Sequence, residues 1–380
     1  MFAEETVDQR LPLQKSVLRM KIMVTGGAGY IGSHTCVELI DAGHEVVIYD
    51  NFCNSNVEVV RRIERITGIG PTVVRGDVRD CDRVAEALAM HRCQAVIHFA
   101  GLKSVAESVS QPLLYYENNV LGSMRLVQAM QKVGVGKLVF SSSATVYGDP
   151  IFLPLTEDHP KSPYSPYGRT KLVVEDMLTE VARSTENFKV AILRYFNPVG
   201  CHISGLIGED PLGVPNNLMP FIAQVAVGRR SHVNIFGNDY ETPDGTGIRD
   251  YVHVVDLAIG HLRALDQLSR EKFIQVNLGT GRGSSVLELV HAFSEACGKQ
   301  IPFVFTARRE GDVASYYACT DLAHKTLGWQ ATRKLHDMCA DTWRWQSQNP
   351  NGYGVVAADP EQSSQTTSNL TPWASGSVRP

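Results

Sequence analysis

The sequence predicts an α/β fold in which a doubly wound parallel sheet is followed by a smaller C-terminal α/β substrate-binding lobe. Two observations lead to this prediction. Short apolar runs alternate with helix-period patterns between residues 21 and 195, which is typical of parallel strands joined by crossover helices. A glycine-rich stretch, residues 24–32, separates the first apolar run from the first helical pattern, as in the phosphate-binding turn of Rossmann-type sheets.

Six apolar runs are expected to form the parallel sheet. They lie at residues 21–25, 45–49, 72–77, 95–99, 137–141 and 190–195. Runs of this length and apolarity suit strands that are buried on both faces. We expect the last of them to complete the sheet.

Helical patterns separate these runs, and Gly43, Gly68 and Gly134 offer stops for three of them. The helices are expected near residues 31–42, 59–67, 82–89, 118–133 and 167–183. Beyond residue 196 the alternation weakens. There we expect a loop-rich segment to residue 220, a strand at 233–237, a segment at 249–254, and helices at 255–265 and 286–297.

Composition limits the classes of function. The chain has 380 residues with a formal net charge of −4 and mixed signs, which argues against a nucleic-acid surface. No apolar stretch approaches the roughly 20 residues of a membrane span, and residues 1–20 lack the apolar core of a secretory signal. Eight cysteines without C-x-x-C spacing favour reduced thiols and no metal site. We therefore expect a cytoplasmic protein that binds neither membrane nor nucleic acid.

The glycine-rich stretch has the spacing G-x-x-G-x-x-G. Gly26 can form the tight turn, Gly29 can let the backbone approach a phosphate, and Gly32 can allow close packing of the helix. A strand that feeds a helix through such a turn directs N–H groups and the positive helix end at one point, where a pyrophosphate fits. Taken alone, the stretch also fits an ordinary structural loop.

Asp50 ends the second expected strand. An acid at this place can accept a hydrogen bond from an adenosine ribose and would repel a 2′-phosphate, so we interpret the cofactor as NAD rather than NADP. The alternative is an acid that merely ends a strand in a turn.

Ser143, Tyr167 and Lys171 are the candidate catalytic residues. Ser143 lies in a hydroxyl-rich strand end, and Tyr167 and Lys171 are four residues apart on one expected helix face. A charge at about 4 Å contributes roughly 4 kcal/mol at an effective dielectric near 20, so we expect Lys171 to lower the pKa of Tyr167 from its usual value near 10. The tyrosinate could then remove a hydroxyl proton while the carbon-bound hydrogen leaves as a hydride to the cofactor. Such Tyr and Lys pairs also arise by chance on helices, and only the glycine turn, Asp50 and the serines give this one weight.

Five segments carry a resemblance to a known family over residues 20–353. They are TGGAGYIGSH at 25–34, FAGLK at 99–103, SSSATVYG at 141–148, the Tyr167 and Lys171 pair, and RYFNP at 194–198. The chain resembles the extended short-chain dehydrogenase/reductase superfamily, and within it the UDP-galactose 4-epimerase family. The resemblance implies an enzyme of galactose metabolism that interconverts UDP-galactose and UDP-glucose. It would oxidise C4 of the hexose to a 4-keto intermediate, let the sugar rotate about its diphosphate, and return the hydride to the opposite face, with tightly bound NAD regenerated in each cycle.

The resemblance also implies the binding residues. Besides Gly26, Gly29 and Gly32, the NAD site would include Tyr30, Ile31, Asp50, Asn51, Asn54, Ser55, Asp77, Val78, Phe99, Ala100, Gly101, Lys103, Asn118, Lys171 and Phe196. The UDP-sugar site would include Ser143, Tyr167, Asn197, Asn216, Asn217, Leu218, Asn234, Phe236, Arg249, Tyr251, Arg309, Asp312 and Tyr316. In this resemblance Tyr316 restricts space at the sugar 2-substituent, and two helices near residues 118–133 and 167–183 form a homodimer.

Two other functions stay open at this stage. One is a dehydratase, decarboxylase or reductase of another nucleotide sugar, but dehydratases and decarboxylases of the superfamily carry an acid just after the catalytic hydroxyl, where this chain has Ala144 and Thr145. The other is a non-catalytic NAD-binding regulator, which intact Ser143, Tyr167 and Lys171 argue against.

The chain is accordingly divided into four parts. Residues 1–19 are expected to be a disordered leader, and residues 20–196 the NAD-binding domain, to which some later segments return. Residues 197–353 are expected to form mainly the substrate-binding lobe. Residues 354–380, rich in Ser, Thr, Gln and Pro, are expected to be a disordered tail.

Overall fold

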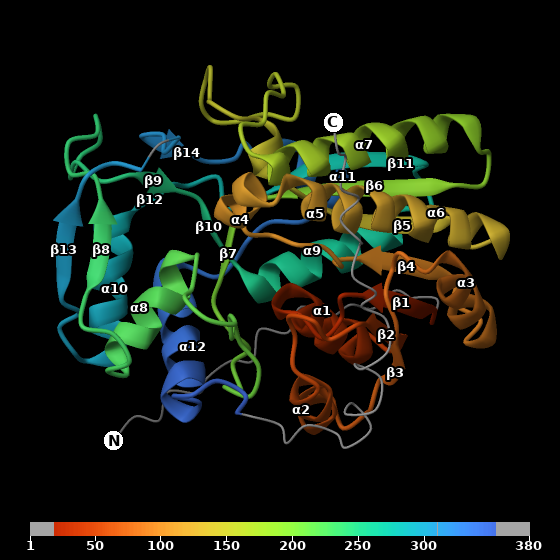
Figure 1. Ribbon diagram of the computed structural model, residues 1–380, viewed down its shortest axis with the longest axis horizontal. Helices are drawn as coiled ribbons and strands as arrows, with labels where there is room; N and C mark the ends of the chain where they lie inside the picture. The colour runs from red at the N-terminus through yellow and green to blue at the C-terminus, as the bar shows by residue number, and fades with distance from the viewer. Residues whose placement is uncertain (1–18, 310, 355–380) are drawn as a thin grey trace, which may run out of the picture.

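The computed structural model describes residues 19–309 and 311–354 (Figure 1). The expected leader, apart from Arg19, and the expected tail, apart from Gly354, lie outside the described residues. No helix within the described ranges is long and apolar enough to cross a membrane.

A seven-stranded parallel sheet forms the centre of the molecule, in the order β11-β6-β5-β4-β1-β2-β3. Its strands are β1 (Lys21–Thr25), β2 (Glu45–Asp50), β3 (Thr72–Arg75), β4 (Ala95–His98), β5 (Lys137–Ser143), β6 (Lys189–Tyr195) and β11 (Phe273–Leu278). The predicted α/β class with a parallel Rossmann-type sheet is confirmed.

The sheet does not end at residues 190–195, as the sequence suggested. β11 pairs with β6 along its whole length, from Phe273 beside Val190 to Leu278 beside Tyr195. The run at 273–278 alternates apolar with polar residues, so it lacks the continuous apolar run by which the other strands were recognised. Its two polar side chains are bonded within the fold, because Gln275 donates to Glu175 at 3.1 Å and the buried Asn277 donates to the carbonyl oxygen of Leu155 at 2.9 Å.

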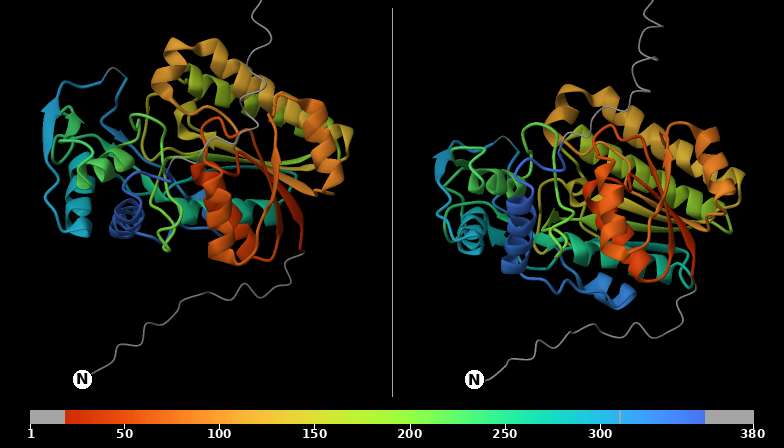
Figure 2. Two further views of the ribbon diagram at one scale, coloured as in Figure 1. Left: turned by 60° about the horizontal axis from the view of Figure 1, so that its bottom comes forward. Right: turned by 90° about the horizontal axis from the view of Figure 1, so that it is seen from below.

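Helices cover both faces of the sheet (Figures 1 and 2). One layer packs on the strand side that includes Ile22 and Val24, and it contains α1 (Tyr30–Asp41), α2 (Glu58–Thr67), α9 (Val254–Gln267) and α11 (Asp321–Leu327). The opposite layer packs on the side of Met23 and contains α3 (Cys81–Met90), α6 (Gly122–Lys132) and α7 (Pro166–Ser184). Successive side chains of β1 thus enter two separate cores, which is why the run is apolar throughout.

The helical region after residue 103 is more divided than the sequence suggested. It consists of α4 (Val105–Ser110), α5 (Pro112–Tyr115), the π-helical segment η1 (Tyr116–Leu121) and α6. Pro112 can begin a helix but cannot continue one, which separates α4 from α5. Asn118 of this π-helical turn borders a large cleft of the molecule. Such turns are frequent at functional sites.

The C-terminal lobe has a core of its own, in which α8, α10 and α12 pack on a small sheet. Its elements are β7 (Asn197–Val199), α8 (Leu218–Ala226), β8 (Val233–Phe236), β9 (Ile248–Arg249), β10 (Tyr251–His253), β12 (Ser284–Ser285), α10 (Val286–Cys297), β13 (Phe303–Thr306), β14 (Ser315–Tyr316) and α12 (Leu335–Gln348). The strands form three small sheets, β10-β7, β12-β9-β14 and β13-β8. α8 begins at Leu218 although a loop was expected to residue 220, because Pro220 is tolerated in the first turn of a helix.

Candidate active site

A cleft of about 2240 Å³ lies between the carboxyl ends of the parallel strands and the C-terminal lobe. Ligands of open α/β sheets bind at this edge. Every residue that the sequence assigned to catalysis, to the cofactor or to the substrate borders the cleft. The structure thus brings together segments that are as far apart in the chain as Gly26 and Tyr316.

The glycine turn has the backbone geometry that a phosphate site requires. Gly26 has a φ of +68°, and a Cβ atom there would lie 2.7 Å from the backbone nitrogen of Ala100. A Cβ at Gly32 would lie 2.3 Å from the carbonyl oxygen of Gly26. Gly29 is the N-cap of α1 and supplies no capping side chain, so the first N–H groups of the helix need another partner. An anionic phosphate is a suitable one.

Asp50 is buried at the end of β2, beside this turn. Its Oδ2 accepts the N–H of Ala28 at 3.0 Å, and its Oδ1 accepts the N–H of Phe52 at 2.9 Å and the hydroxyl of Ser55 at 3.0 Å. Since a carboxylate offers about four acceptor positions, Asp50 can still accept one hydrogen bond from a ribose hydroxyl.

Asp77 lies further along the same end of the cleft, after β3. Its carboxylate pairs with the guanidinium of Arg79 at 2.9 Å and accepts the amide of Asn51 at 3.0 Å. The bond from Arg79 is the main cause that lowers the pKa of Asp77 to about 2. The group therefore stays ionised and holds Asn51 in place at the cleft wall.

Ser143, Tyr167 and Lys171 meet where β5 ends and α7 begins. The Oγ of Ser143 accepts the N–H of Thr145 at 3.2 Å and its hydroxyl at 3.0 Å. Burial raises the pKa of Tyr167, and a hydrogen bond with Ser143 opposes that rise. Ser143 is therefore already directed at the phenol oxygen.

The expected effect of Lys171 on Tyr167 is wrong for this arrangement. The ammonium of Lys171 donates to the carbonyl oxygen of Ser141 at 2.7 Å and lies 5.9 Å from the centre of the Tyr167 ring. Burial of the phenol outweighs any stabilisation of its ionised form, so the pKa of Tyr167 is raised, not lowered. Burial also lowers the pKa of Lys171 to about 8, against a smaller opposite effect of Glu175.

A buried ion pair lies next to the cluster of Ser143, Tyr167 and Lys171. Glu175, one turn after Lys171 on α7, pairs with the guanidinium of Arg194 at 2.7 Å, and both side chains are 1% exposed. Ser142 donates to the same carboxylate at 2.5 Å, and Arg194 donates to the hydroxyl of Tyr147 at 2.9 Å. The pair therefore links α7 and β6 to β5, next to the end of β5 that carries Ser143.

Two arginines of the C-terminal lobe reach the cleft from the opposite side. Arg249 on β9 donates to the carbonyl of Val313 at 2.8 Å and faces Asp312 at 3.4 Å. Arg309 lies 3.8 Å above the ring of Phe236. Guanidinium groups in such positions can pair with phosphate oxygens.

Tyr316 links the lobe to the segment that follows β5. It lies beside Arg249 in the β14–β9 pair, and its hydroxyl donates to the carbonyl oxygen of Ala144 at 2.6 Å. Its ring lies 5.7 Å from that of Phe196. The ring is thus fixed next to Ser143.

Some residues that border the cleft belong to no motif and were not predicted from the sequence. Glu209 pairs with Lys103 at 2.8 Å and accepts the amide of Asn217 at 3.0 Å. Tyr353, near the end of the described chain, also borders the cleft. Both lie in segments without periodicity, so only the tertiary structure reveals their position.

Known proteins share this fold and its motifs. Residues 23–342 match the family model described as GDP-mannose 4,6 dehydratase. The chain is 56% identical over 336 residues to the UDP-glucose 4-epimerase of Yersinia pestis, which covers 88% of this chain and 99% of the relative. It is 54% identical over 335 residues to that of Bacillus subtilis, with 88% and 99% covered. The chain belongs to the UDP-glucose 4-epimerase family.

Solved structures of the UDP-glucose 4-epimerase family have the same architecture. The enzyme of Stenotrophomonas maltophila, with bound NAD and formylated UDP-arabinopyranose, superimposes with a TM-score of 0.86 at 53% identity, covering 87% of this chain and 99% of that one. The enzyme of Bifidobacterium longum, in complex with NAD⁺ and UDP, has a TM-score of 0.84 at 48% identity, with 87% and 99% covered. The family resemblance predicted from the five segments is confirmed.

Proposed function

We propose that this protein interconverts UDP-galactose and UDP-glucose by transient oxidation at C4 of the hexose, using a tightly bound NAD. The observation that carries the proposal is the cleft itself. It unites a phosphate-binding turn, a Ser143, Tyr167 and Lys171 cluster, and two arginines on the facing lobe. Relatives more than 50% identical are UDP-glucose 4-epimerases, and structures of the family contain NAD together with a UDP-sugar or UDP.

The cleft residues around the glycine turn and Asp50 fit NAD. Gly26 leaves a cradle that a Cβ atom would fill, and Asp50 retains one acceptor position for a ribose hydroxyl. An acid at this place disfavours a 2′-phosphate, which supports NAD over NADP. When bound, NAD supplies the acceptor and donor of the hydride at C4.

The chain's own groups handle the proton and hold the sugar. Tyr167 removes the proton from the 4-hydroxyl and returns it, while Ser143 donates to the same oxygen and keeps it in line. Lys171 contributes positive charge behind the phenol when it is protonated. Arg249 and Arg309 hold the diphosphate, about which the 4-keto sugar rotates to present its other face.

The residues after Ser143 favour epimerisation over dehydration. The matching family model bears the name of a 4,6-dehydratase, and the superfamily's dehydratases carry an acid just after the catalytic hydroxyl. Here the side chains are those of Ala144, which is buried, and Thr145, whose hydroxyl is bonded to Ser143. Neither can transfer the further proton that elimination requires.

We also propose a homodimer that acts in galactose metabolism in the cytoplasm. The predicted interface comprises η1, α6 and α7, which lie side by side on one face of the sheet (Figure 1). Leu113, on the adjoining α5, and Tyr116, the first residue of η1, are 82% and 38% exposed. Exposed apolar side chains near this face support a protein contact.

A turnover experiment without added cofactor tests the proposed reaction. The purified protein is incubated with UDP-galactose alone, and the products are followed by NMR. We expect an equilibrium mixture with UDP-glucose, and a loss of at least about a hundredfold in Tyr167→Phe, which cannot transfer the proton. Conversion that requires a stoichiometric supply of external cofactor, or a dehydrated or decarboxylated product, would contradict the proposal.

A further inference from the structure

The loop between β7 and α8 crosses from the C-terminal lobe to the dinucleotide-binding half. Its residues 205–210, here called the strap, are fastened to α2 by Arg62, whose guanidinium donates to the carbonyl of Leu206 at 2.9 Å and to the side chain of Asn349 at 2.7 Å. Asn349 in turn donates to the carbonyl of Gly205 at 3.1 Å. At the far end of the strap, Glu209 forms its ion pair with Lys103. The strap is therefore attached to the dinucleotide-binding half at both ends.

Residues 349–354 hold the middle of the strap. The hydroxyl of Tyr353 bonds with both the N–H and the carbonyl of Gly208, at 3.0 and 3.1 Å. The N–H of Tyr353 donates to Asp210 at 2.9 Å. Its ring lies 4.9 Å from the guanidinium of Arg62 and 4.6 Å from the ring of Trp345, and the same guanidinium lies 5.5 Å from the Trp345 ring. This one side chain joins α2, α12 and the strap.

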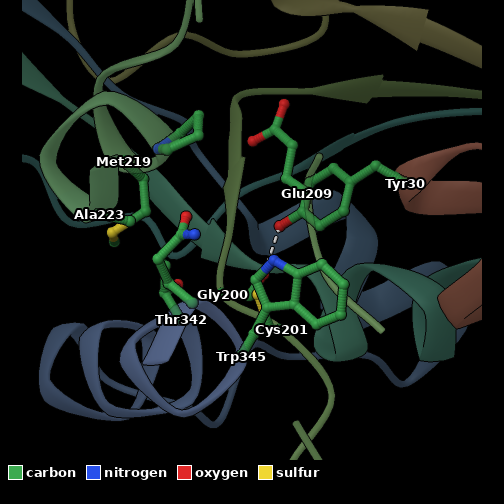
Figure 3. A pocket seen from close by; sticks show the side chains of 10 residues that line it. Tyr30, Gly200, Cys201, Glu209, Met219, Ala223, Thr342 and Trp345 are labelled. Atoms are coloured by element: carbon green, nitrogen blue, oxygen red, sulfur yellow. Dashed lines mark hydrogen bonds between the residues drawn. The ribbon is translucent and has the colours of Figure 1, made fainter. Parts of the chain in front are cut away.

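The strap lies beside the start of α1, where the diphosphate of a dinucleotide is expected. Gly208, Glu209 and Tyr353 border the same cleft as Gly29 and Tyr30. The hydroxyl of Tyr30 donates to the carbonyl of Gly200 at 2.6 Å, just before the strap. Figure 3 shows Tyr30 of α1 next to Glu209 and above Trp345, around a small cavity of about 10 Å³. Figures 1 and 2 show the loop after β7 and the end of α12 running together near α2.

We propose that residues 349–354 belong to the cofactor site and that Tyr353 and Arg62 keep the strap closed over the diphosphate end of the cleft. The dinucleotide then leaves only when the strap detaches. The inference rests on the proposed use of NAD and explains how NAD stays bound between turnovers. It assigns cofactor retention to side chains that lie outside the glycine turn and outside the catalytic cluster.

Retention of NAD in the full-length chain tests this proposal. Tyr353→Ala removes the ring and both bonds to Gly208, and Tyr353→Phe removes only the bonds. Asn351→Ala is the control, because Asn351 is exposed in the same segment. NAD per chain is measured after heat release from extensively washed protein, and the release rate is followed with an excess of an NAD-consuming enzyme as a trap. We expect release to be roughly tenfold faster or more in Tyr353→Ala, since two hydrogen bonds are lost, less so in Tyr353→Phe, and unchanged in Asn351→Ala.

If Tyr353→Ala does not fold, a second pair of variants tests whether the strap retains NAD. Arg62→Met keeps the stem against the two rings but loses the bonds to Leu206 and Asn349. Arg61→Met makes the same change of charge on α2 at a side chain that is 76% exposed. Faster release in Arg62→Met than in Arg61→Met supports the proposal. Release at the wild-type rate in Arg62→Met and in Tyr353→Phe overturns it.

The NAD content of the wild-type protein in the same experiment distinguishes failure of the strap proposal from failure of the proposed function. If the wild-type protein and all variants retain NAD equally well, the strap does not control the release of NAD. The proposed function is then unaffected. Wild-type protein that carries no NAD after purification contradicts the proposed function, and the strap proposal fails with it.

Discussion

At the scale of single residues, burial sets the charges of the proposed catalytic cluster. Tyr167 and Lys171 both lie where their ionised forms are poorly solvated, so the pKa of the phenol is raised and that of the ammonium is lowered to about 8. At pH 7 the phenol of Tyr167 is therefore neutral, whereas the ammonium of Lys171 is still mostly protonated and its burial costs stability. A positive charge brought by a bound nicotinamide would shift Tyr167 back toward its ionised form.

The shifted pKa of Lys171 predicts a pH-dependent stability. Between the folded pKa of about 8 and the unfolded value near 10.5, the unfolded state binds more protons, so stability rises with pH across this window. Below about pH 8 the full cost of the buried charge is present. Lys171→Met should therefore be more stable than wild type at pH 7, by roughly 1–3 kcal/mol.

Urea unfolding of both proteins at pH 7 and at pH 9.5 measures this difference. We expect the stability gap between Lys171→Met and wild type to shrink at the higher pH, while the variant loses activity at both. An equal gap at the two pH values would contradict the assigned shift.

Tyr316 predicts substrate selectivity at the same scale. Its ring is fixed next to the catalytic cluster proposed here by the bond to the carbonyl of Ala144 and by Phe196, so in the proposed complex it takes up space near the sugar. Tyr316→Cys should admit N-acetylated UDP-hexoses that the wild type excludes. Tyr316→Phe retains the ring and should keep the wild-type preference. The ratio of kcat/KM for UDP-N-acetylgalactosamine to that for UDP-galactose reports the effect, and an unchanged ratio in Tyr316→Cys would refute the assignment.

At the scale of elements, the junction of β1 and α1 depends on backbone conformation and not on side-chain contacts. Gly26 combines a positive φ with a close approach to Ala100, whereas Gly43, at the end of the same helix, has a φ of +88° and no heavy atom within 4 Å of an added Cβ. The two glycines therefore separate the cost of the backbone conformation from the cost of the contact. Gly26 precedes α1 and Gly43 follows it, so substitutions at the two glycines can be compared at the two ends of one helix.

Alanine substitutions at the two glycines should differ accordingly. Gly43→Ala is expected to cost about 1–2 kcal/mol of stability because an L-residue must adopt the left-handed conformation, and it should retain NAD. Gly26→Ala is expected to cost more and to release NAD, because its Cβ displaces the loop after β4. Urea unfolding and NAD content per chain are the measurements. Equal stability losses with NAD retained in both variants would argue against a phosphate site at this turn.

At the scale of the whole molecule, the cleft exists because the chain returns to the sheet partway through the second lobe. α9 packs on α1, and β11 extends the sheet beyond β6. Residues 349–354 then come back to α2. These returning segments hold the two halves together around the ligands.

The proposed dimer gives a prediction for the assembled molecule. Leu113→Glu places a charge on the most exposed apolar side chain near the proposed interface, so it should convert a dimer into a monomer. Met90→Glu is a matched control on α3, where the side chain is 66% exposed. Sedimentation velocity distinguishes the species. A wild-type monomer, or a dimer that survives Leu113→Glu, would count against this interface.

The sequence by itself determined the features that depend on local chemistry. The first six strands of the sheet were visible as apolar runs, and all of them except the largely exposed edge strand β3 are buried on both faces. The predicted glycines also mark helix ends, because Gly68 caps α2 with a left-handed φ of +71° and Gly43, with a φ of +88°, follows the cap of α1. The three-glycine turn, Asp50 and the pair of Tyr167 and Lys171 were recognisable because their spacing reflects one turn or one helix. Each of these signals lies within a few residues of the chain.

Only the tertiary structure decided the features that depend on distant segments. β11 was missed because Gln275 and Asn277 interrupt its apolar run and find their partners in distant segments, and the carbonyl of Ser141 was not foreseeable as the partner of Lys171. The pKa of Tyr167 was expected to fall but is raised, since burial depends on the whole surrounding fold. Glu209 and Tyr353 reach the cleft through contacts with Lys103 and Arg62, more than a hundred residues away along the chain. Local patterns carry no information about such contacts, because long-range packing alone brings the partners together.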